Sequence, residues 1–146
     1  MLDQIISTIT KKVGDRLTTE VGLTQKQAQE SITIAGESAV HVIQEEAAKG
    51  KTSELTNLFN KDTAERSQNP IFSKIETLFL TKLSSSLNIS GTKASSIKDL
   101  ILPYLIKTIG QSSKVGDTFD ISTLRSLIQP GKGSLGEKLG GFFKKP

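Results

Sequence analysis

Residues 15–28 read DRLTTEVGLTQKQA, and residues 81–94, which lie 66 positions later, read TKLSSSLNISGTKA. Each stretch runs from a leucine through polar residues to an apolar residue, which is followed by Gly22 in the first stretch and Asn88 in the second. Glycine and asparagine adopt the left-handed backbone conformation that ends many helices more readily than other residues. Both stretches therefore predict the end of a helix at the same point.

A hydroxyl residue follows two positions later in each stretch, Thr24 in the first and Ser90 in the second. Such a hydroxyl accepts a hydrogen bond from a free backbone N–H at the start of a helix, and Gln27 is placed to complete a capping box with Thr24. The two stretches are thus interpreted as two versions of one corner between two helices.

The apolar residues on both sides of this corner also recur after 66 positions. Their spacing of three and four residues is that of one helix face. The coinciding pairs are Ile5 and Ile71, Ile6 and Phe72, Ile9 and Ile75, Val13 and Phe79, Leu17 and Leu83, Val21 and Leu87, Leu23 and Ile89, Ala28 and Ala94, Ile34 and Leu100, Val40 and Ile106, and Ile43 and Ile109.

This pattern predicts an all-α fold, a helical bundle built from two copies of a three-helix unit with no β-sheet. The domain is expected over residues 1–129, with repeat 1 at about 1–60 and repeat 2 at about 70–129, followed by a Gly/Lys-rich tail over 130–146. No segment shows sustained alternation of apolar and polar residues, which a half-buried strand would require.

The second repeat has two distinctive prolines. Asn69 and Pro70 form a cap and a first helical position, which predicts a helix start there. Pro103 lies within IKDLILPYLIKTI, residues 97–109, which is apolar almost all round and is therefore expected at the centre of the bundle. Pro103 should kink or break that helix, because it removes one backbone hydrogen bond and crowds the carbonyl of Asp99.

The composition and the apolar pattern indicate the cellular compartment in which the chain is expected. The 146 residues include no cysteine, which excludes disulfides and thiolate metal sites and fits a reducing compartment. The start, MLDQIISTITKKVGDRL, has an acid before an interrupted apolar pattern and does not resemble a signal peptide. The longest apolar run, residues 100–106, is far shorter than the roughly 20 residues of a membrane span. A cytoplasmic protein is expected.

Several stretches resemble the YidB-like family of small bacterial proteins of unknown function: MLDQIIS, NPIFSKIETLFLTKL, ASSIKDLILPYLIKTI and FDISTLRSLI. The resemblance covers about residues 1–129. It implies an all-helical bacterial domain and supplies no catalytic or ligand residues. The charged linker KDTAERSQNP departs from the more glycine-rich linker expected of the family.

No motif predicts catalysis, a cofactor or a metal. His41, the only histidine, lies four residues from both Glu37 and Glu45 and is interpreted as a surface residue between solvated acids. GKGSLG at 131–136 matches the G-x-G-x-x-G string, but it follows a predicted helix instead of a strand. The chain is therefore expected not to be an enzyme.

The tail combines five glycines and four lysines with four apolar residues spaced as one helix face. It could be a disordered segment, a segment that orders against a protein surface, or a contact with an anionic membrane. The candidate partner contacts in it are Leu135, Leu139, Phe142, Phe143, Lys144 and Lys145.

These observations favour a non-enzymatic module that binds an unidentified protein partner. The alternative is nucleic-acid binding, because residues 1–59 carry six bases and eight acids (net −2), whereas 70–129 carry seven and four (net +3). The tail adds four bases and one acid. The bases of the second half are dispersed along the chain, at Lys74, Lys82, Lys93, Lys98, Lys107, Lys114 and Arg125.

Overall fold

The computed structural model describes residues 2–60, 68–116 and 118–128. Its helical elements are α1 (Leu2–Arg16), η1 (Leu17–Val21), α2 (Gln25–Ala48), α3 (Thr52–Asn60), α5 (Pro70–Leu87), α6 (Gly91–Ser112) and α7 (Ile121–Ile128). The all-α prediction is confirmed. Within the described ranges, none of these helices is long and apolar enough to cross a membrane.

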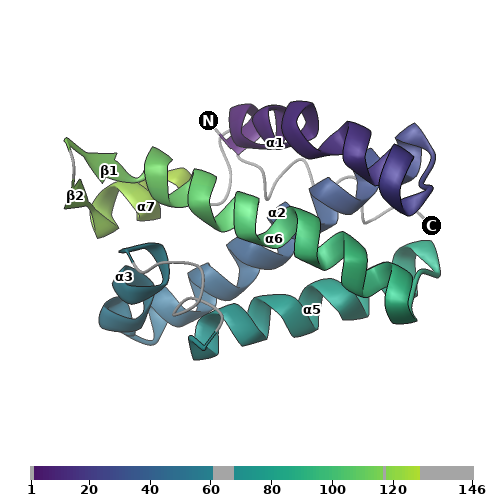
Figure 1. Ribbon diagram of the computed structural model, residues 1–146. Helices are drawn as coiled ribbons and strands as arrows, with labels where there is room; N and C mark the ends of the chain where they lie inside the picture. The colour runs from purple at the N-terminus through teal and green to yellow at the C-terminus, as the bar shows by residue number, and fades with distance from the viewer. Residues whose placement is uncertain (1, 61–67, 117, 129–146) are drawn as a thin grey trace.

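The long helices form a bundle in which α2 and α6 cross at the centre, with α1 on one side and α5 on the other (Figure 1). Both central helices contact α1, α3, α5 and α7 as well as each other. The expectation of a central helix at 97–109 is met by α6, but α2 shares that position and buries 12 of its 24 residues, against 8 of 22 in α6.

The corner predicted at Gly22 is present. Gly22 has φ +85° and its N–H donates to the carbonyl of Leu17. Asn88, 66 positions later, has φ +57° and its N–H donates to the carbonyls of Leu83 and Ser84. Both residues end their helices in the left-handed conformation, as glycine and asparagine can.

The residue after Gly22 and the residue after Asn88 each donate a backbone hydrogen bond to the carbonyl six positions earlier. The N–H of Leu23 donates to the carbonyl of Leu17 at 3.1 Å, and that of Ile89 to the carbonyl of Leu83 at 3.2 Å. All four side chains are buried. This six-residue bond with an apolar contact is the Schellman arrangement. The copies differ in that the last turn before Gly22, η1, is a π-helix.

The predicted helix starts are largely confirmed. The Thr24 hydroxyl accepts from the N–H of Gln27 at 3.0 Å, and the Gln27 side chain accepts from the N–H of Thr24 at 3.1 Å, which completes the capping box. The side chain of Asn69 accepts from the N–H of Ile71 at 2.8 Å. Ser90 precedes α6 without a side-chain capping bond.

The core contains both members of most coinciding pairs. Those buried on both sides are Ile5 and Ile71, Ile9 and Ile75, Val13 and Phe79, Leu17 and Leu83, Leu23 and Ile89, Ala28 and Ala94, Val40 and Ile106, and Ile43 and Ile109. The helix contacts correspond too: α2 packs on α5 as α6 packs on α1, and α2 contacts α7 as α6 contacts α3. On this basis we propose an internal duplication.

Two local features differ from expectation. A two-residue antiparallel pair, β1 (Lys114–Val115) with β2 (Thr118–Phe119), joins α6 to α7, where no β-sheet is expected. Its strands are too short to show alternation, and it is held by stacking of Phe119 on Phe59 with ring centroids 5.3 Å apart. In addition, of the kink or break predicted at Pro103, the break is absent: α6 is continuous from Gly91 to Ser112, with buried residues on both sides of the proline.

Candidate functional site

The six tail residues predicted as partner contacts, Leu135, Leu139, Phe142, Phe143, Lys144 and Lys145, lie outside the described residues, as do 130–146 as a whole. A groove in the described part of the chain lies elsewhere, between α2 and α5.

Two ion pairs join α2 to α5. Glu37 of α2 pairs with Lys82 of α5, and Glu46 Oε1 lies 3.0 Å from Lys74 Nζ. The residue numbers rise along α2 as they fall along α5, so the two helices run antiparallel. The pairs are separated by nine residues on α2, about 14 Å at the rise of an α-helix.

Of the two glutamates, Glu46 is more deeply buried than Glu37. Its side chain is only 1% exposed, and Lys49 Nζ lies 3.4 Å from its second oxygen, Oε2. The hydrogen bond from Lys74 lowers the pKa of Glu46, and this effect together with that of Lys49 outweighs the opposing effect of desolvation. Glu46 therefore stays ionised near neutral pH and attaches α5 to the end of α2.

A groove of about 430 Å³ lies between α2 and α5, within the stretch that the two ion pairs span. Val42 is buried and Leu78 half-buried, so they form its apolar part, and the polar residues are exposed. Such a surface can take an apolar side chain together with hydrogen-bonding groups. The lining residues are His41, Val42, Glu45, Ser73, Lys74, Thr77, Leu78 and Thr81.

His41 lies at this groove and does not gather further ligands. Its Nε2 is 3.7 Å from Glu45 Oε2, while Glu37 is engaged by Lys82. Within the described ranges, no group of three or more His, Cys, Asp or Glu side chains is arranged to hold a metal ion.

A smaller groove of about 220 Å³ lies between the end of α1 and the start of α2. Asp15 is its only charged lining residue, and the rest are small or neutral: Thr10, Gly14, Thr18, Gln25, Ala28 and Gln29.

The dispersed bases of the second half divide into two groups. Lys74 and Lys82 are paired with acids as described, and Lys98 Nζ lies 3.4 Å from Glu76 Oε2 and 3.5 Å from Asp99 Oδ1. The other four are exposed and have no acidic partner among the described residues: Lys93, Lys107, Lys114 and Arg125.

Two further exposed lysines lie outside the basic second half on which the nucleic-acid alternative depends. Lys11 and Lys12 lie on α1, in the half of the chain with net charge −2. The 66-residue correspondence could have indicated that they lie on a surface between two helices. It places them at the positions of Thr77 and Leu78, which line the α2–α5 groove.

Comparisons of the chain with protein-family models, with curated proteins and with solved structures find no match in any of the three. The function must therefore be argued from the described surface itself.

Proposed function

We propose that this chain is a non-enzymatic helical module that binds another protein, and that the α2–α5 groove receives the partner. The observation that carries the proposal is the groove itself, an apolar base of Val42 and Leu78 beneath exposed hydroxyl groups. The ion pairs on the same two helices hold them together in the absence of a partner.

The charges at the groove indicate the chemistry of the partner. Lys74 is neutralised by Glu46, whereas the exposed Glu45 lies 3.7 Å from the His41 ring. A segment that offers an apolar side chain next to a lysine or arginine would place the cation at Glu45 and the apolar group on Leu78.

No catalytic role is proposed, since the chain has no cysteine and a single histidine. The tail contacts predicted from the sequence, the YidB-like resemblance and the cytoplasmic location that fits the absence of cysteine remain parts of this proposal. The nucleic-acid alternative depends on seven basic side chains of the second half. Three of them are engaged in ion pairs with acidic side chains: Lys74, Lys82 and Lys98.

Site-specific crosslinking tests the proposal. A photo-crosslinking residue is placed at Thr77 in the groove, or at the exposed Lys51 as the control, and the tagged chain is recovered from its native cells with and without nuclease. We expect one protein to be captured through position 77, to survive nuclease, and to be lost when Leu78→Asp is added.

Three results would contradict the proposal: equal capture through Thr77 and Lys51, loss of the captured material on nuclease treatment, or a monomeric chain with no crosslinked protein. The same experiment with residues 130–146 removed separates the groove from the tail. Capture that depends on those residues assigns the contact to the tail.

A further inference from the structure

We call the contact between α1 and α6 the α1–α6 seam, and the contact between α2 and α5 the α2–α5 seam. The first corresponds to the second. The two halves coincide after 66 residues, so α1 matches α5 and α6 matches α2, and each pair is in contact. The side chains at matching positions differ in charge. Three residues that line the α2–α5 groove are replaced by lysine on the other seam: Thr77 by Lys11, Leu78 by Lys12 and His41 by Lys107. Two other lining positions change the other way, because Asp15 stands in place of Thr81 and Thr8 in place of Lys74.

Three acids of α2 have no acidic counterpart on α6. The three glutamates that serve the α2–α5 seam all have neutral counterparts on α6. The replacements are Glu37 by Pro103, Glu45 by Gln111 and Glu46 by Ser112. The two ion pairs that join α2 to α5 therefore have no equivalent at the matching positions of α1 and α6.

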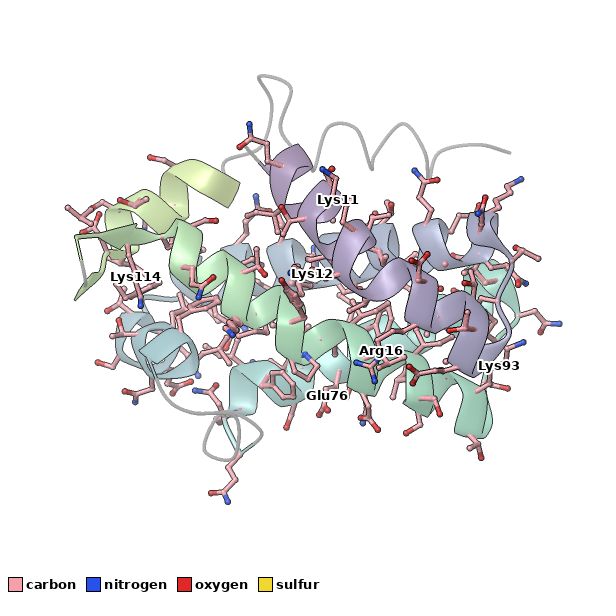
Figure 2. The ribbon with its side chains drawn as sticks, turned by 45° about the horizontal axis from the view of Figure 1, so that its top comes forward. Lys11, Lys12, Arg16, Glu76, Lys93 and Lys114 are labelled. Atoms are coloured by element: carbon pink, nitrogen blue, oxygen red, sulfur yellow. The ribbon has the colours of Figure 1, made fainter. Side chains whose placement is uncertain are left out.

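We name the set Lys11, Lys12, Lys93, Lys107 and Lys114 the α1–α6 basic face. All five are exposed, and none has an ion pair within the described part of the chain. Figure 2 shows Lys11 and Lys12 on α1, with Lys114 and Lys93 toward the two ends of α6. Lys93 and Lys107 are 14 residues apart, about 21 Å along the helix axis.

Nearby residues modify this charge only slightly. Arg16 also lies on α1, but Glu20 holds it at 2.8 Å, so the pair is neutral. Asp15 of α1 is an exposed acid close in sequence to Lys11 and Lys12. Ser7, Thr8 and Gln111 of the same two helices are exposed and carry hydrogen-bond donors and no charge. Asp99 of α6 is an exposed acid that lies 3.5 Å from Lys98.

The chemistry of this face does not suit a protein partner. Protein interfaces are depleted of lysine and depend on apolar or aromatic anchors. The only large apolar side chain that is highly exposed in the described ranges is Val115, at the hairpin tip. Lysine instead binds phosphate as a point charge, and a row of such charges neutralises a phosphate backbone without reading bases.

We propose that the α1–α6 basic face binds the phosphate backbone of nucleic acid independently of sequence. This inference does not rest on the α2–α5 groove, and it locates the site on α1 and α6 instead of on the bases of the second half alone. Five lysines would contact at most about five phosphates. Binding is then expected in the range of about 10⁻⁴ to 10⁻⁶ M, typical of non-specific contacts, and to weaken steeply with salt.

Fluorescence anisotropy with a labelled DNA duplex of about 20 base pairs tests this, at salt concentrations between about 50 and 200 mM. The variant Lys12→Gln/Lys107→Gln removes two charges from the face. The control Lys26→Gln/Lys51→Gln removes two exposed charges that lie on neither α1, α6 nor β1. Far-UV circular dichroism checks that each variant is folded.

We expect the face variant to lose about tenfold in affinity at the lower salt concentration, and the slope of log K against log salt to become shallower by about two. The control should stay within about twofold of the natural chain. Absence of duplex binding at low salt, or an equal loss in both variants, would overturn the proposal. Displacement of the duplex by polyglutamate of equal total charge at a lower concentration would also overturn it, in favour of an acidic protein.

Discussion

Replacing Lys74 by methionine tests how much the charge pair across α2 and α5 stabilises the fold. Lys74 donates to Glu46 at 3.0 Å, and the Glu46 side chain is 1% exposed, so the variant leaves a nearly buried carboxylate with only Lys49, at 3.4 Å. A hydrogen bond to a charged group contributes roughly 1.5–3 kcal/mol.

The lower end of that range applies to Lys74→Met. The Lys74 side chain is 45% exposed, which screens the pair, and Lys49 still serves the carboxylate. We expect a loss of about 1.5 kcal/mol in the free energy of unfolding near pH 7, and a fall in Tm of roughly 3–8 °C. Thermal and urea unfolding followed by circular dichroism measure both quantities.

The loss should depend on pH. The pKa of Glu46 in the folded chain is lowered below its ordinary value of 4.5, so its contribution is present above that value and is lost as the pH falls through the folded pKa. The difference between the natural chain and Lys74→Met should therefore shrink as the solution is acidified below about pH 4.

The control for this series is Lys51→Met, which removes an exposed lysine and should change stability by no more than about 0.5 kcal/mol. Equal stability of the Lys74 and Lys51 variants near neutral pH would refute the assignment of Glu46 as a charged attachment point. A difference between the natural chain and Lys74→Met that widened in acid would refute it as well.

Three further substitutions test local features by the same unfolding measurements. Thr24→Ala should cost about 1 kcal/mol because it removes the capping box, whereas Ser90→Ala should cost less because its side chain makes no capping bond; equal losses would contradict this. Pro103→Ala should stabilise the chain by about 1–3 kcal/mol, since it restores a backbone donor inside α6; a loss would show that the proline is required. Ser31→Ala should stabilise by about 1 kcal/mol, because the buried Ser31 hydroxyl has no hydrogen-bond partner among the described residues; a destabilised variant would indicate a bound water.

The helix ends could be predicted from the sequence because their chemistry is local. Gly22, Asn88, Thr24 and Asn69 each act within a few residues of their own position, so short stretches contain the whole signal. The pair of two-residue strands could not be predicted, since four residues show no periodicity and their position depends on the distant contact between Phe119 and Phe59.

The central position of α2 in the bundle could not be predicted for a different reason. Its buried face includes small residues such as Ala35, Gly36 and Ala39, so its average hydrophobicity is modest although its neighbours pack closely around it. The pairing of Glu46 with Lys74 could not be predicted, because the two residues are 28 positions apart and their contact depends on how α2 and α5 align. Hydrophobicity and local spacing do not specify that alignment.

The central claim is that the two corresponding seams have different roles, a neutralised groove between α2 and α5 and a free basic face on α1 and α6. Backbone amide chemical shifts of the isotopically labelled chain, titrated with the DNA duplex, test both parts at once. We expect shifts at Lys11, Lys12, Lys107 and Lys114, and none at Thr77 or Leu78. Shifts centred on the α2–α5 groove, or spread evenly over all exposed lysines, would contradict the account.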